Sequence, residues 1–182
     1  MKLLSVQVGL PRTLRWRGRA IATGIYKEPV DSRIMLRRFN LDGDQQADLA
    51  VHGGRDKAVY VYPSEHYAFW RKELPGEKLP YGSFGENFTS EGLDEQSVHI
   101  GDRFRIGGAV VEVTQPRLPC YKLGLRFRRP DMPKRFHASG LCGFYLAVIE
   151  EGEVGAGDAW QRIAHDNKEL SVRESYRRVF EE

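Results

Sequence analysis

Hydrophobic and polar residues alternate in short runs along most of the chain, which is the pattern of half-buried β-strands. The runs that predict strands are Lys2–Val8, Arg33–Phe39, Ala58–Tyr62, Arg103–Ile106, Ala109–Thr114, Gly143–Ile149 and Asp158–Ala164. Gly107 and Gly108 separate two of these runs and predict a tight hairpin. Arginines alternate around Trp16 before Ala20–Thr23, which predicts a second basic patch or, more simply, a charged hairpin. So many short strands with few helices between them favour a mainly β fold, a β-barrel with a few short helices.

Two segments carry the signals of helices. The first follows Ser64 as its expected cap and stops before Pro75-Gly76. It carries four ring-bearing side chains that we expect in the core, namely His66, Tyr67, Phe69 and Trp70. The second begins with a capping box formed by Ser171 and Glu174, and its apolar face consists of Val172, Tyr176, Val179 and Phe180. We therefore expect a β-barrel domain over residues 1–164 and a C-terminal helical appendage over residues 165–182.

Composition and length indicate an ordinary soluble protein. The 182 residues are 41% hydrophobic and 29% charged, which suits one main domain with a substantial core. No apolar run approaches the length of a membrane span, and the first six residues are too short and too alternating for a signal peptide. We expect a cytoplasmic location, and we expect both cysteines, Cys120 and Cys142, to stay reduced.

Positive charge is concentrated in one segment. The formal net charge is only +3, but residues 117–135 contain seven basic residues against the single acid Asp131. These are Arg117, Lys122, Arg126, Arg128, Arg129, Lys134 and Arg135. The segment contains no recognised nucleic-acid motif, so nucleic acid is not the expected partner. The pattern favours a small phosphorylated ligand, and its alternative is a solvated basic loop.

Two prolines precede a cysteine that is flanked by two cations. Pro116 and Pro119 fix the backbone, so we expect the preceding strand to end at Thr114 in a shaped loop. Arg117 and Lys122 flank Cys120, and cationic neighbours favour the thiolate, the form that attacks electrophiles or binds metals. The residues alone leave nucleophile and metal ligand open.

Two glycine-containing turns are further candidates for a binding site. His52-Gly53-Gly54 is able to form an anion-binding nest of backbone N–H groups, with Arg55 and Lys57 adding charge. Its equally good alternative is a hairpin turn with a hydrogen-bonded histidine. In the turn Gly82–Thr89, Glu86 and Asn87 either orient a ligand or cap the turn.

Other metal and hydrolase chemistries have weaker support. Residues 42–48 superficially suggest a calcium loop, but they lack the required glycine and the closing glutamate. A zinc site of Cys120, His137 and Cys142 lacks a known ligand spacing. A cysteine hydrolase that uses Cys120 with His52 or His137 is disfavoured because these histidines are distant in the sequence.

Four motifs, taken together and in this order, resemble those of the MOSC domain family, named after the C-terminal domain of molybdenum cofactor sulfurase. They are Val51-His52-Gly53-Gly54-x-x-Lys57-Ala58-Val59-Tyr60, Phe84-Gly85-Glu86-Asn87, Ile100-Gly101-Asp102 and Thr114-Gln115-Pro116-Arg117-x-Pro119-Cys120. Within the family the chain is most similar to the YiiM-like, hydroxylaminopurine-resistance type, over residues 1–164. The resemblance implies a MOSC-type β-barrel. Relatives of this type carry a three-helix domain after the barrel, whereas this sequence predicts one helix.

The resemblance also implies a cofactor and a reaction. The cofactor is a molybdenum-bound pterin, with Cys120 as the catalytic residue and the protein ligand of the metal. The implied cofactor-binding residues are His52, Gly53, Gly54, Lys57, Glu86, Asn87, Gln115, Arg117 and Lys122. The implied reaction is the two-electron reduction of N-hydroxylated bases or amidines. Electrons then come from an external electron-donor protein, because the sequence has no flavin or iron–sulfur motif.

Two other functions are compatible with the same residues. Cys120 could carry a persulfide and pass sulfur to a metal cluster or a cofactor. Alternatively, the protein could carry the molybdenum cofactor without catalysing a reaction. The sequence leaves the physiological substrate and the oligomeric state open.

Overall fold

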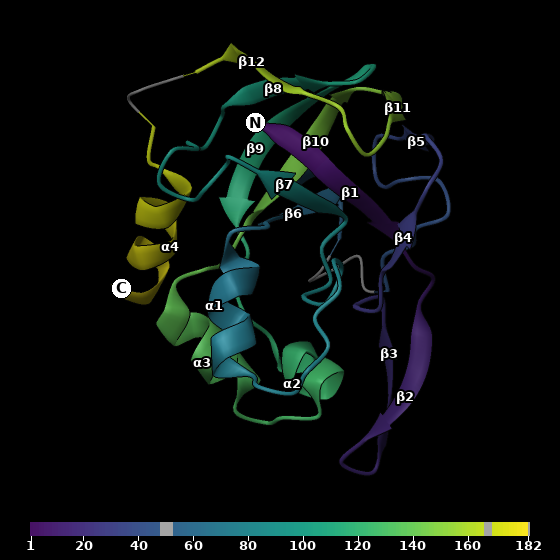
Figure 1. Cartoon of the computed structure of the whole chain (residues 1–182), viewed down its shortest axis with the longest axis vertical. Coiled ribbons are helices and arrows are strands. Elements are labelled where there is room, and N and C mark those ends of the chain that lie inside the picture. Colours follow the sequence, from purple (N-terminus) through teal and green to yellow (C-terminus); the bar gives the residue numbers. More distant parts are fainter. Residues whose placement is uncertain (48–52, 166–168, 182) are drawn as a thin grey trace.

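The alternating segments assemble mainly into one large mixed sheet (Figure 1). The structure is a computed structural model that describes residues 1–47, 53–165 and 169–181. In spatial order the strands of this sheet are β12 (Trp160–Ala164), β8 (Arg103–Ile106), β9 (Ala109–Pro116), β10 (Phe144–Glu150), β6 (Val59–Pro63), β7 (Phe88–Glu91), β1 (Lys2–Val8) and β4 (Glu28–Val30). Neighbouring strands are antiparallel except for the parallel pair of β6 and β7.

Two small sheets accompany the large one. The first pairs β2 (Arg12–Trp16) with β3 (Arg19–Thr23), and the second pairs β5 (Ile34–Leu36) with β11 (Gly152–Val154). The β2–β3 pair confirms the predicted charged hairpin, which extends away from the large sheet (Figure 1). Its tip turns through Arg17 and Gly18, both with positive φ, as the tight turn between two strands requires.

The predicted closed barrel is not what the strands form. The secondary structure is mainly β with four helices, as expected, but among the described residues the large sheet is open, with β12 and β4 at its two ends. The sheet stays open because two segments share the outer edge of β1. Val6–Val8 pair with β4, and only the first residues of β1 meet the start of β12, through the isolated bridge between Lys2 and Ala159.

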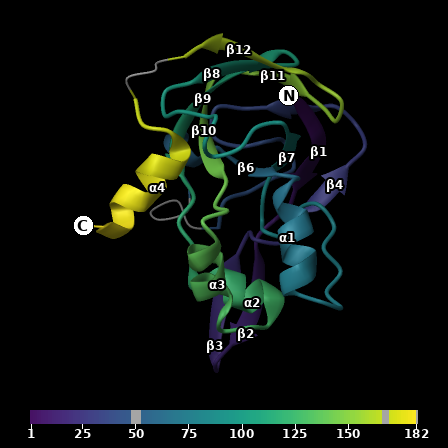
Figure 2. The same cartoon turned by 60° about the vertical axis from the view of Figure 1, so that its left-hand side comes forward.

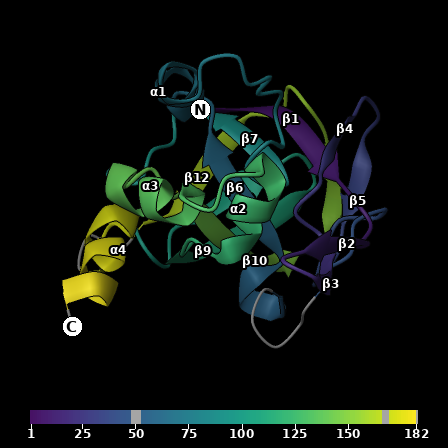
Figure 3. The ribbon, with the colours of Figure 1, turned by 90° about the horizontal axis from the view of Figure 1, so that it is seen from below.

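Four helices and a short 3₁₀ turn accompany the sheets. They are η1 (Arg55–Lys57), α1 (His66–Glu73), α2 (Tyr121–Phe127), α3 (Met132–Ser139) and α4 (Val172–Glu181). Figures 2 and 3 show that α1, α2 and α3 gather on one side of the large sheet. None of the helices in the described part of the chain has the length and apolar character needed to cross a membrane.

The structure corrects the interpretation of residues 117–135 as a loop, because this basic segment contains α2 and begins α3. Pro133 near the start of α3 and Gly140 with positive φ at its end are both helix-boundary signals. These two residues, rather than the charge of the segment, mark the bounds of α3.

The strand before the cysteine is also longer than predicted. It ends at Pro116, which pairs with Phe144 of β10, rather than at Thr114. Proline is tolerated there because the pairing of β9 with β8 stops at Glu112, so no strand on that side needs the missing N–H. By contrast, the run Arg33–Phe39 yields only the short strand β5.

The predicted helix α1 is confirmed, and it contributes to an aromatic core. Trp70 stacks on Phe136 of α3 with 5.9 Å between ring centroids, and Tyr62 of β6 lies 4.8 Å from Phe84. All four of these rings are fully buried. Phe69 is the exception to the core prediction, with 40% of its surface exposed. The expected Ser64 cap is wrong, because Glu65 occupies the N-cap position.

The capping box at the start of α4 is present as predicted. The Glu174 N–H donates to the Ser171 hydroxyl at 3.2 Å, and the Ser171 N–H donates to the Glu174 carboxylate at 2.9 Å. Val172 and Tyr176 are buried, whereas Phe180 near the end of the same face is 47% exposed. The first half of α4 therefore docks onto the protein, and its capping box fixes where the helix begins.

Removing this cap should measurably destabilise the protein. We expect Ser171→Ala to lower the free energy of unfolding by about 1 kcal/mol, which corresponds to a melting temperature lower by about 2–4 °C. Ser32→Ala changes an exposed serine outside any helix and is the matched control, with an expected effect within about 0.5 kcal/mol. Equal melting temperatures for the two variants in a thermal unfolding experiment would show that the box does not support the fold.

Candidate functional site

An open pocket lies where several segments distant in the sequence meet. It spans about 650 Å³, open solvent at its mouth included. Its described lining is Thr23, Gly24, Ile25, Lys27, Asp44, Gln45, Gln46, Ala47, Lys57, Ala58, Tyr60, Phe84, Gly85, Asn87, Arg117, Cys120, Lys122 and Tyr145. The pocket thus lies between the base of the β2–β3 hairpin, the start of β6 and the loop that leads from β9 into α2.

Cys120 reaches this pocket from the start of α2. It is the N-cap residue, with extended backbone angles, and its carbonyl accepts a hydrogen bond from the Leu123 N–H at 3.0 Å. Cys120 is partly exposed and Cys142 is fully buried, and both are thiols. Burial raises the pKa of Cys142 well above its ordinary value, so this second cysteine stays protonated. Cys120 is therefore the cysteine available for chemistry.

Arg117 is the most unusual residue of the site, because its charge is buried. It is only 5% exposed, and its guanidinium lies 4.9 Å from the ring centres of both Tyr60 and Phe136. Its Nη1 atom is buried without a hydrogen-bond partner, and no carboxylate of the described residues forms an ion pair with it. Burial acts to lower the pKa of Arg117, but Tyr60, Tyr145 and Cys120 raise it overall, so the guanidinium stays charged.

Three lysines add positive charge to the pocket. Lys57 and Lys122 line it, and Lys122 is 7% exposed. Lys27 is neutralised in part, because it forms a buried ion pair with Asp44. Burial lowers the pKa of Lys27 while Asp44 acts to raise it. The pocket therefore combines a thiol with an excess of cations, an arrangement suited to an anionic ligand.

Asn87 and Asp44 form a hydrogen-bonded part of the pocket wall. The Asn87 amide donates to Asp44 at 3.0 Å and to the Gln7 carbonyl at 3.2 Å, and its oxygen accepts a hydrogen bond from the Tyr60 N–H. Asp44 also accepts from the Gly9 N–H at 2.8 Å. Asn87 lines the pocket, but its side chain already bonds to three protein groups, so it orients β6 within the site.

The structure brings together five of the residues expected at the site: Lys57, Asn87, Arg117, Cys120 and Lys122. The other described candidates do not line the pocket. Gly54 has the expected positive φ, but its N–H donates to the Gln46 side chain rather than pointing to a vacant anion site. Gly53 and Gln115 are partly buried outside the lining, and His52 lies outside the described residues.

Glu86 is buried behind the pocket in a network of its own. Its carboxylate accepts hydrogen bonds from the Tyr67 hydroxyl, from the Gly82 N–H at 2.7 Å and from the Phe84 N–H at 3.1 Å. Burial raises the pKa of Glu86, although these donors act to lower it. Glu86 thus shapes the turn that presents Phe84 and Gly85 to the pocket.

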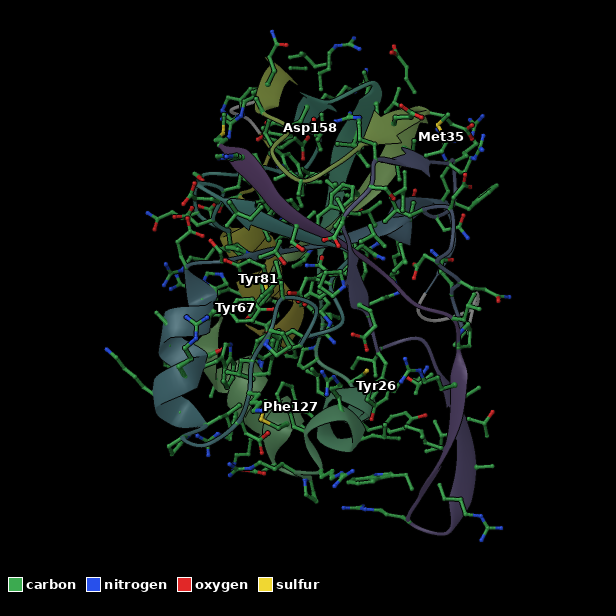
Figure 4. All side chains as sticks on the ribbon, turned by 45° about the vertical axis from the view of Figure 1, so that its right-hand side comes forward. Tyr26, Met35, Tyr67, Tyr81, Phe127 and Asp158 are labelled. Carbon is green, nitrogen blue, oxygen red and sulfur yellow. The ribbon has the colours of Figure 1, made fainter. Side chains whose placement is uncertain are left out.

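Two tyrosines, Tyr60 and Tyr145, and the base of the β2–β3 hairpin line the pocket but were not expected there from the sequence. Tyr60 and Tyr145 face each other from β6 and β10, with ring centroids 5.4 Å apart. Burial raises the pKa of Tyr145, while Arg117 acts to lower it. Tyr26, just after the lining residue Ile25, lies under Arg126 of α2 at 5.0 Å, and Figure 4 shows Tyr26 between α2 and the hairpin. The alternation over Ala58–Tyr62 predicted the strand that carries Tyr60, but it gave no sign of Tyr145.

His137, the histidine of the zinc alternative and one of the two proposed for the hydrolase, packs against α4. His137 belongs to α3 and its side chain contacts α4, where its Nδ1 is 3.1 Å from the Tyr176 hydroxyl and its ring centroid is 4.0 Å from that of Phe180. Among the described residues, Cys120, His137 and Cys142 do not form a ligand group. His52, the other proposed partner of Cys120, lies outside the described residues.

Comparisons with known proteins agree with the four motifs. The MOSC domain family matches residues 48–161. YflK of Bacillus subtilis is 47% identical over 171 residues, which cover 94% of this chain and 77% of YflK. A Gibberella moniliformis protein named reductase is 36% identical over 158 residues, 85% of this chain and 28% of that protein. The crystal structure of YiiM from Geobacillus stearothermophilus superimposes with a TM-score of 0.81 at 32% identity, covering 98% of this chain and 83% of YiiM. The chain therefore belongs to the MOSC domain family.

Proposed function

We propose that the pocket binds a molybdenum-bound pterin and that the protein reduces N-hydroxylated compounds. The observation that carries the proposal is the buried Arg117 guanidinium, whose Nη1 lacks a partner in a pocket that also contains the Cys120 thiol. A buried cation without a counterion is unfavourable, so an anionic ligand is the natural complement of this site. A pterin phosphate is such an anion.

The chemistry of the lining residues fits this cofactor. A soft thiolate is a suitable ligand for a metal that already binds sulfur. Arg117 offers a planar set of donors that suits a phosphate, and Lys122 and Lys57 add compact charges. Tyr60 and Tyr145 provide flat apolar surfaces beside them. Cys120 would therefore bind the metal, while Arg117, Lys57 and Lys122 would bind the anionic part of the cofactor.

The chain's own residues then have separate tasks. The cofactor, when bound, supplies two-electron chemistry that converts an N–OH group and two protons into N–H and water. The charge of Arg117 interacts electrostatically with Cys120, so Arg117 would stabilise negative charge there. The partly open mouth gives a small substrate access. Burial keeps the hydroxyls of Tyr60 and Tyr145 protonated, and that of Tyr60 donates to the Cys142 carbonyl.

The name of one relative favours a reductase over the alternatives, and the name of the family supports the cofactor. The MOSC family takes its name from molybdenum cofactor sulfurase, and the Gibberella moniliformis relative is named a reductase. We propose that an external protein supplies the electrons and that the reaction takes place in the cytoplasm. A persulfide carrier would also use Cys120, and a cofactor carrier would use the same cations, so experiments must separate the three.

Loss of the Cys120 thiol should remove the metal. We expect the protein, isolated from cells that make the pterin, to contain molybdenum in about a one-to-one ratio, and Cys120→Ser to lose most of it, because an alcohol is a poor ligand for a soft metal site. Elemental analysis measures both. Cys142→Ala is the control, since Cys142 is buried away from the pocket lining, and it should keep its metal.

Three outcomes would point elsewhere. Equal trace molybdenum in wild type and Cys120→Ser, together with a persulfide on Cys120, would favour the sulfur carrier. Stoichiometric molybdenum without reduction of an N-hydroxylated purine by a chemical electron donor would favour the cofactor carrier. Molybdenum that persists in Cys120→Ser would contradict the role of this cysteine as metal ligand.

Loss of one pocket cation should weaken cofactor retention. We expect Lys122→Met to cost about 1.5–3 kcal/mol of binding free energy, the range for a hydrogen bond to a charged group, which is roughly a ten- to hundredfold weaker affinity. Measuring pterin and molybdenum retained after dialysis tests this. Lys134→Met removes an exposed lysine of α3 and should retain the cofactor like wild type. Equal retention in the two variants would show that Lys122 does not bind the anion.

A further inference from the structure

A second cluster of ligand-type side chains lies outside the pocket. One donor atom each from His99, Asp102 and His165 lies within 4.8 Å of the other two, the only such group of histidine, cysteine and acidic residues in the described ranges. His99 and Asp102 belong to the turn that enters β8, and His165 directly follows β12. The pairing of β12 with β8, which joins Ala164 to Arg103, brings the two sides of the cluster together.

The Asp102 carboxylate is held in a fixed orientation. It is fully buried, and its Oδ2 accepts a hydrogen bond from the His99 N–H at 3.0 Å. Its Oδ1 lies 2.5 Å from Nδ1 of His165. Carboxylates that bind metals are themselves held by hydrogen bonds, as the His99 N–H holds Oδ2 here.

His99 supplies an independent observation. Its Nδ1 is buried and has no hydrogen-bond partner, which is uncommon for a buried polar atom. The two imidazole rings meet edge to face, with 4.9 Å between their centroids. The hydrogen bond from the His99 N–H to Asp102 accounts for the position of the His99 main chain. It does not account for the presence of an imidazole side chain at this position.

We propose that His99, Asp102 and His165 form a binding site for a divalent cation, and that Zn²⁺ suits it best. Two imidazoles and one carboxylate are a common donor set for zinc, and water would complete the coordination. Small rotations of the rings would bring the donors to zinc distance, since each ligand atom must lie about 2.0–2.2 Å from the metal. The His165 side chain is 26% exposed, so the ion has a path from solvent.

Arg162 is the group that opposes a cation here. Its Nη2 lies 3.6 Å from Asp102 Oδ2, the oxygen that does not face His165. The same atom donates to the Ser97 carbonyl at 2.8 Å, and the guanidinium lies over the Phe104 ring, so it is held on that side of the carboxylate. Its charge lowers the affinity of the site without occupying the space between Asp102 and the two imidazoles.

A bound ion would fasten the start of α4 to the sheet. His99 forms a β-bridge with Ser171, the capping residue of α4, and the Ile100 N–H donates to the Leu170 carbonyl at 2.9 Å. Metal ligands from β12 and from this turn would therefore stabilise the region where the helix begins. The inference does not rest on the proposed function of the pocket.

The test uses the full chain in a Cys120→Ser background, so that the pocket thiol does not compete for the metal. After chelator treatment, isothermal titration with ZnCl₂ should give one Zn²⁺ per chain. Adding His99→Gln or His165→Gln should weaken binding by about tenfold or more, as loss of groups around a metal does. His137→Gln changes a histidine outside the cluster and should leave binding unchanged.

Thermal unfolding separates a metal site from a purely structural hydrogen-bond network. We expect Zn²⁺ to raise the melting temperature of the background protein, and this increase to disappear in His99→Gln while the folded circular dichroism spectrum persists. Absence of zinc binding by the background protein would overturn the proposal. Equal zinc affinity in His99→Gln, His165→Gln and His137→Gln would overturn it as well.

Discussion

The buried positive charge of Arg117 is the constraint on which the architecture of the pocket depends. Removing a charge from water without pairing it costs several kcal/mol. Contacts with the Tyr60 and Phe136 rings offset part of this desolvation cost, at about 0.5–2 kcal/mol for each cation–π contact. Those rings come from β6 and α3, so the guanidinium joins the sheet to the helices that cover it. The buried guanidinium is therefore preorganised to bind an anion.

The surrounding polar networks explain how this charge is held beside the thiol. Asn87 ties β6 to β1 and to Asp44, while Glu86 organises the neighbouring turn. Arg117 itself is positioned by the pairing of Pro116 with Phe144 and by its own N–H, which donates to the Gly143 carbonyl at 3.3 Å. Three residues later, Cys120 begins α2. Both functional side chains are thus placed by the end of one strand.

Local patterns made part of this predictable from the sequence. Alternation gave most strands of the large sheet, and the capping box gave α4 because both signals act within a few residues. The basic segment around Cys120 correctly suggested cations near a thiol. The open sheet was not predictable, because it depends on how β4 and the start of β12 share the edge of β1. Tyr145 and Lys27 joined the pocket only through pairing between distant strands and loops, which leaves no local signal.

The central claim is that Arg117 and Cys120 bind two parts of one cofactor. A crystal structure of the protein isolated from pterin-producing cells, with anomalous data collected at the molybdenum edge, tests it most directly. The account predicts a molybdenum peak next to Cys120 Sγ and a phosphate in contact with Arg117 Nη1. A metal peak away from Cys120, or a pocket in which Arg117 Nη1 meets only water, would contradict it.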